Sequence, residues 1–145
     1  GPEVRVIYLD SSVLCEIYLG QARSRQATLI LGGPAPKVSS WLIAVEVPIV
    51  LRRALAPDRR NRKLLGAALD QFDEDLKSLS LYEDLSQIAA RIRQDERLSV
   101  CRALDALHVA TALHLQAVAQ HPLQVASFDD RLCDVARLVG LEVLG

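Results

Sequence analysis

Four carboxylates stand where they could perform metal-assisted chemistry. Asp10 and Asp129 follow apolar runs with strand character, whereas Glu46 and Asp105 interrupt apolar helical patterns. Two carboxylates about 4 Å apart repel each other by roughly 4 kcal/mol at an effective dielectric constant of 20, so a cluster needs protons or a cation. Oxygen ligands favour Mg²⁺ or Mn²⁺, which can activate a water against a phosphodiester. The four acids therefore predict metal-dependent hydrolysis.

Each of these side chains also has a structural explanation. An aspartate after a strand can form a turn or cap a helix. Glu46 could pair with the arginines at 52–53, and Asp105 could favour its helix N-terminus or pair with Arg102. His108, three residues beyond Asp105, is either a structural histidine or a group that orients Asp105 or touches a substrate. The four acids together favour the functional interpretation more strongly than any one of them does alone.

The elements that would position the acids alternate between strands and helices. Apolar runs predict strands at 4–9, 37–40, 79–82, 123–128 and 141–144. Amphipathic patterns predict helices between them, at 12–19, 24–31, 41–55, 59–77, 85–97, 101–116 and 131–139. Ser11 or Ser12 is expected to cap the first helix. This alternation predicts an α/β fold with one parallel sheet covered on both faces, whose ligands bind beyond the carboxyl ends of the strands.

Composition narrows the class of protein. A chain of 145 residues is the usual size of one domain, and its apolar runs are far shorter than the roughly 20 residues that span a bilayer. The net charge of −1 provides no overall attraction to nucleic acid, so any such binding requires a local patch. The arginines at 52–53 and the basic cluster at 59–63 are candidates. The three cysteines form no CxxC pair, which indicates reduced thiols in a cytoplasmic protein.

Four segments, in this order, resemble the PIN domain ribonucleases, and in particular the toxins of VapBC-type toxin–antitoxin pairs. They are YLDSSVLCEIYLG (8–20), SSWLIAVEVPIVLRRA (39–54), LDALHVATAL (104–113) and SFDDRLCDVARLVGLEV (127–143). The resemblance implies a single PIN-like α/β/α domain over residues 3–145. Residues 1–2 are expected to be the remnant of a purification tag. The resemblance further implies endonucleolytic cleavage of RNA by a water that Mg²⁺ or Mn²⁺ assists.

The same resemblance assigns the site. The first three acids of the family fall on Asp10, Glu46 and Asp105. The fourth falls on Asp129, with Ser127 where the family usually has threonine, although the adjacent Asp130 could take that role. In the toxin pairs an antitoxin wraps the toxin and blocks its acids. We therefore expect a cytoplasmic homodimer with an RNA substrate, a VapB-like antitoxin partner and no association with membranes.

Two alternative functions remain at this stage. One is a housekeeping PIN ribonuclease in RNA processing or decay, without an antitoxin. The other is a non-catalytic PIN-like interaction module, against which the presence of all four acids argues. A phosphoacceptor receiver-like domain also clusters acids at strand ends, but it needs a lysine after a late strand. The only lysines here are Lys37, Lys63 and Lys77.

Overall fold

A five-stranded, wholly parallel sheet forms the middle layer of the protein. The computed structural model describes residues 5–144, and the expected tag remnant at 1–2 lies outside them. The strands follow the order β3-β2-β1-β4-β5 across the sheet. They are β1 (Val6–Leu9), β2 (Lys37–Ser40), β3 (Ser80–Tyr82), β4 (Leu123–Ala126) and β5 (Glu142–Leu144). The prediction of a parallel sheet is confirmed.

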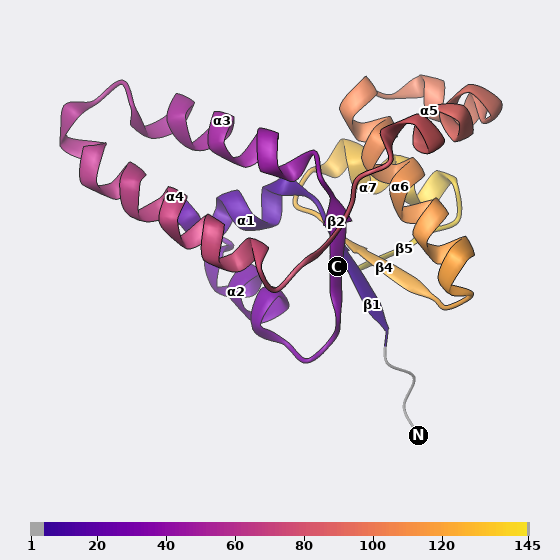
Figure 1. The fold of residues 1–145 in the computed structure, drawn as a ribbon, viewed down its shortest axis with the longest axis horizontal. Coiled ribbons are helices and arrows are strands. Elements are labelled where there is room, and N and C mark those ends of the chain that lie inside the picture. Colours follow the sequence, from indigo (N-terminus) through magenta and orange to yellow (C-terminus); the bar gives the residue numbers. More distant parts are fainter. Residues whose placement is uncertain (1–4, 145) are drawn as a thin grey trace.

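Helices cover both faces of this sheet, as Figure 1 shows. One layer contains α1 (Ser11–Tyr18), α2 (Ser24–Gly32), α3 (Ile43–Leu55) and α4 (Arg62–Leu76). The other contains α5 (Leu85–Gln94), α6 (Ala103–Ala119) and α7 (Asp130–Leu138). Each layer encloses its own hydrophobic core against the sheet. The arrangement is the expected α/β/α fold, and none of the helices within residues 5–144 is long and apolar enough to cross a membrane.

The central strand β1 explains why its sequence is apolar throughout. Successive side chains of a strand point to opposite faces of the sheet. Ile7 and Leu9 accordingly pack into the core beneath α1 to α4, while Tyr8 packs into the core beneath α6 and α7. Both faces are buried, so no position can remain in water. Tyr8 therefore places a polar hydroxyl inside the core, where it needs a hydrogen-bond partner.

Several element boundaries differ from those predicted. Asp10, rather than Ser11 or Ser12, is the N-cap of α1, because its extended backbone lets the carboxylate accept a hydrogen bond from the Ser12 N–H (3.1 Å). The helix expected from residue 59 begins with a 3₁₀ turn, Arg59–Asn61. Strand β4 ends at Ala126 instead of residue 128, so Asp129 lies beyond a short loop.

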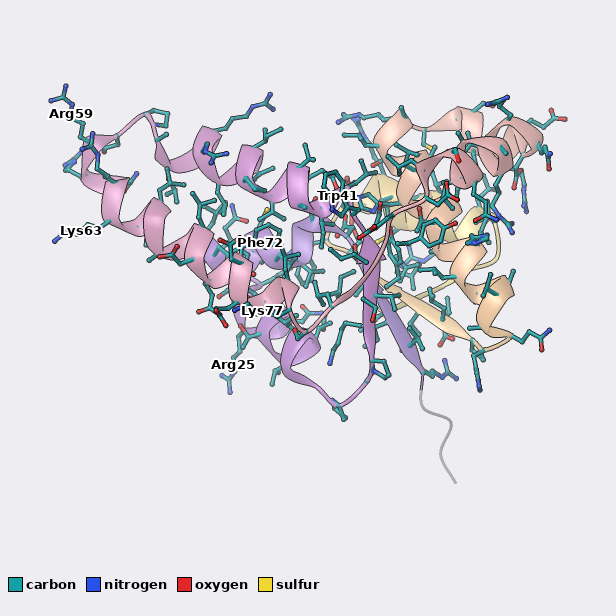
Figure 2. All side chains as sticks on the ribbon, in the orientation of Figure 1. Arg25, Trp41, Arg59, Lys63, Phe72 and Lys77 are labelled. Carbon is teal, nitrogen blue, oxygen red and sulfur yellow. The ribbon has the colours of Figure 1, made fainter. Side chains whose placement is uncertain are left out.

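The α3–α4 hairpin extends away from the sheet. The 13 residues of α3 make a rod of about 20 Å. Figure 2 shows Arg59 and Lys63 at its far end and Trp41 beside the sheet. We call residues 59–63 the distal basic cluster. The length of α3 separates this cluster from the sheet, and its role as a candidate RNA contact stays a prediction.

Candidate active site

Asp10 follows the last residue of β1 at the carboxyl edge of the sheet and is 4% exposed. Its Oδ1 accepts a hydrogen bond from the Ser12 hydroxyl (2.6 Å), and its Oδ2 accepts one from the Ser127 hydroxyl (2.8 Å). Burial raises the pKa of the Asp10 carboxyl, and these hydrogen bonds only partly offset that shift. The aspartate is thus held in one orientation at a cost in electrostatic free energy.

Glu46 enters the site from α3, one turn after the helix begins. Its Oε1 lies 2.6 Å from His108 Nε2, and His108 Nδ1 lies 2.7 Å from the Tyr8 hydroxyl. Glu46 therefore pairs with a histidine from the opposite helical layer, and not with the arginines at 52–53. Of the alternatives left open for His108, the structure shows a buried histidine whose hydrogen bonds go to Glu46 and Tyr8 and not to Asp105.

Asp105 lies in the first turn of α6 and is 8% exposed. Burial is the main cause that raises the pKa of its carboxyl, and the negative charge of Asp129 raises it further. Nearby Arg102 and His108 lower it. Among residues 5–144, no side chain or backbone group donates a hydrogen bond to the Asp105 carboxylate within the usual geometry, which leaves its oxygens available for a ligand.

Asp129 caps α7, where its Oδ1 accepts hydrogen bonds from the backbone of Arg131 (3.0 Å) and Leu132 (3.4 Å). Its backbone N–H donates to the Ser127 hydroxyl, which links it to Asp10. Asp130, the first residue of α7, is exposed. Of these two acids, Asp129 is the one whose charge acts on Asp105.

The structure brings the four candidate acids to one edge of the sheet. Glu46 raises the pKa of both Asp10 and Asp105, so the carboxylates are close enough to repel one another. Within the described part of the chain, however, no three side chains of His, Cys, Asp or Glu are close enough to hold an ion by themselves. Mg²⁺ usually keeps several waters and binds one or two carboxylates together with substrate phosphates. The oxygen donors fit that mode of binding, rather than a cage built by the protein alone.

A hollow of about 610 Å³ opens beside one of these acids, Asp105. Its lining includes Asp105, Arg102 and Arg131. Neither arginine forms an ion pair with a carboxylate of residues 5–144, although Arg102 is near enough to lower the pKa of Asp105. Two guanidinium groups beside a carboxylate suit a phosphodiester backbone, because each guanidinium can donate two parallel hydrogen bonds to the oxygens of one phosphate.

Sequence reasoning missed two contributors to this site. Tyr8 was treated only as part of a strand, yet the alternation of β1 alone puts it on the α6 face with a hydroxyl to satisfy. Arg131 was not considered as a phosphate ligand, although it stands two residues after Asp129. For Tyr8 the signal was its place in the alternation of the strand, and for Arg131 it was its spacing of two residues from Asp129.

Comparisons with known proteins agree with this geometry. The fold and the acidic edge define an α/β/α domain of the nuclease type, and the PIN domain family matches residues 7–138. The chain therefore belongs to the PIN domain family. A search of curated proteins found no significant match.

Two solved structures show the same fold. One is VapBC2 from Rickettsia felis bound to a DNA fragment from its promoter, with 10% identity, a TM-score of 0.62, and coverage of 96% of this chain and 97% of that chain. The other is VapC20 from Mycobacterium tuberculosis, a toxin that cleaves the sarcin-ricin loop, with 16% identity, a TM-score of 0.60, and coverage of 93% and 95%.

Proposed function

We propose that this protein is the ribonuclease toxin of a toxin–antitoxin pair and that it cleaves RNA endonucleolytically. The observation that carries the proposal is the meeting of Asp10, Glu46, Asp105 and Asp129 at the carboxyl edge of a PIN-domain sheet. Such a cluster is unfavourable without a cation, because neighbouring carboxylates add to the rise in the pKa values of Asp10 and Asp105 that burial mainly causes. The fold that the chain shares with the VapC20 toxin supports the choice of RNA.

The side chains divide the work of this reaction. The four acids, together with waters and substrate phosphates, would hold Mg²⁺ or Mn²⁺, and the ion would activate a water and stabilise the departing oxygen of the phosphodiester. Asp10 is held for this role by Ser12 and Ser127. We assign the fourth position to Asp129 rather than Asp130, because Asp130 is exposed, whereas the charge of Asp129 raises the pKa of Asp105.

The substrate would approach through the hollow beside Asp105. Arg102 and Arg131 would bind phosphates next to the scissile bond. Their charges would offset the repulsion between an RNA backbone and the acids, which a molecule of net charge −1 cannot do by long-range attraction.

We also propose protein partners, a VapB-like antitoxin and a second copy of the chain, all in the cytoplasm. The support is a line of exposed apolar side chains at Trp41 (46% exposed), Val45 (44%) and Ile49 (41%). Val45 and Ile49 are four residues apart on α3 and therefore lie on one side of it, and Trp41 precedes the helix four residues before Val45. Contiguous exposed apolar surface of this kind is typical of protein interfaces. Light scattering tests the homodimer, which should give twice the chain mass of 15.9 kDa.

The test of the function is cleavage of total cellular RNA by the purified protein with Mg²⁺, Mn²⁺ or EDTA. An Asp10→Asn variant of confirmed fold is the matched control. We expect discrete, metal-dependent products from the parent protein alone, and sequencing of their ends would identify the target. If neither metal supports cleavage and calorimetry detects no Mn²⁺ binding, the proposal is wrong and a non-catalytic interaction module becomes the better interpretation.

A further inference from the structure

A buried chain of hydrogen bonds joins the central strand to the acidic edge. It runs from the Tyr8 hydroxyl to His108 Nδ1 (2.7 Å) and from His108 Nε2 to Glu46 Oε1 (2.6 Å). Tyr8 is 0% exposed and His108 is 2% exposed. We infer that His108, locked in one tautomer by Tyr8, is a positioning residue that fixes the carboxylate of Glu46 for the reaction. This inference rests on the proposed ribonuclease function.

The tautomer follows from the environment of Tyr8. A phenol keeps its proton at neutral pH, and the fully buried Tyr8 hydroxyl lies 2.7 Å from His108 Nδ1. It can therefore donate to His108 Nδ1. A neutral imidazole carries one N–H, and with Nδ1 as acceptor that N–H must be on Nε2. The Nε2–H then donates to Glu46, the hydrogen bond that an ionised carboxylate needs.

The three hydrogen-bonded side chains come from three different layers of the fold. Glu46 comes from α3 in one helical layer, His108 from α6 in the other, and Tyr8 from the strand between them. The rings of Tyr8 and His108 pack edge to face, with centroids 5.8 Å apart and planes at 73°. Because this pair is closed in by the core, the imidazole cannot rotate without repacking its neighbours.

Glu46 gains most from such support. Its side chain has three rotatable bonds and remains 17% exposed, so by itself it would sample several orientations. The hydrogen bond from His108 commits Oε1, whereas Oε2 makes no hydrogen bond to any of residues 5–144. One oxygen is thus anchored, and the other is available to bind an ion. Residues that orient a metal-binding carboxylate or imidazole side chain in this way commonly affect metal affinity or activity by about 10–100-fold.

Four variants separate positioning from simple filling of the core. His108→Leu removes the donor and keeps most of the bulk. His108→Gln offers an amide N–H in place of Nε2–H, and Tyr8→Phe removes only the hydroxyl. The control is His114→Leu on the same helix, where the imidazole packs against Tyr82 with ring centroids 5.1 Å apart.

Two kinetic and binding measurements should respond. In His108→Leu we expect kcat for RNA cleavage to fall by about 10–100-fold with little change in KM, and Mn²⁺ affinity by calorimetry to weaken over a similar range. His108→Gln should recover most of both losses, and Tyr8→Phe should lose less than His108→Leu. His114→Leu should match the parent protein in kcat and Mn²⁺ affinity even if its melting temperature falls. A purely structural role predicts instead that kcat follows melting temperature across all four variants.

A third measurement does not depend on RNA. Imidazole ¹⁵N spectra at about pH 8 should show His108 as the Nε2–H tautomer. Tyr8→Phe should add the Nδ1–H form. A parent protein with Nδ1–H or with a doubly protonated ring overturns the inference, as does His108→Leu with parental kcat and Mn²⁺ affinity. If the parent cuts no RNA, the proposed function fails while the spectra and Mn²⁺ affinities still decide the role of His108.

Discussion

Replacement of Asp10 by asparagine should separate the function of this residue from its part in stability. Asp10 caps α1 and accepts hydrogen bonds from the Ser12 N–H, the Ser12 hydroxyl and the Ser127 hydroxyl. Asparagine can keep this network, because its Oδ1 accepts from Ser12 and its amide can donate to Ser127 Oγ. Asparagine and aspartate are nearly equal as N-caps. The substitution also removes a buried carboxyl group whose pKa burial raises.

The expected result is a protein that folds as well as its parent and cuts RNA poorly. We expect the free energy of unfolding of Asp10→Asn to lie within about 1 kcal/mol of the parent value, or above it, so that the melting temperature falls by no more than about 4 °C. Loss of an essential acid should lower kcat by about 10²–10⁴-fold.

Asp10→Ala provides the contrast. It removes the cap, at a cost of about 0.5–2 kcal/mol, and leaves the Ser127 hydroxyl without its acceptor, at a cost of about 1–3 kcal/mol. Its melting temperature should fall by roughly 6 °C or more. Thermal unfolding and RNA cleavage of the three proteins decide the matter. Full activity in Asp10→Asn would refute the catalytic role, and a destabilisation equal to that of Asp10→Ala would refute the account of the hydrogen bonds.

Three further predictions concern charge, core and substrate binding. Burial raises the pKa of Asp10 and Asp105, so the folded protein keeps their protons to higher pH than the unfolded chain does, and metal-free protein should lose stability as the pH rises from about 4 through those raised values. Mg²⁺ should accordingly raise the melting temperature more at about pH 8 than at about pH 5; an equal rise at both would contradict this. Replacement of Phe72, which is 2% exposed, by alanine should lower the free energy of unfolding by about 3–5 kcal/mol in a denaturant titration. A loss below about 1 kcal/mol would place Phe72 outside the core. Joint replacement of Arg102 and Arg131 by alanine should raise KM and flatten the dependence of RNA binding on salt, whereas alanines in the distal basic cluster should change neither; the reverse pattern would move the RNA to the α3–α4 hairpin.

Local patterns in the sequence determined the architecture. The apolar run before Asp10 has the length and β-branched content of a buried parallel strand, and the stripe that contains Phe72 has the period of a helix packed on one side. Strands and helices that alternate in this way bury both faces of a sheet, so the α/β/α layers followed. The acids were found because carboxylates at strand ends and in apolar helical positions conflict with local burial, a conflict that is typical of functional sites.

Only the tertiary structure decided which partners these acids have. Hydrogen bonds between Glu46 and His108, and between Asp10 and Ser127, join residues 62 and 117 positions apart, and no local periodicity specifies such contacts. Helix length likewise carried the distal basic cluster away from the site, although it is close to Glu46 in the sequence. Sequence patterns set which face of an element is buried, whereas the packing of two helical layers against one sheet sets which side chains meet at its edge.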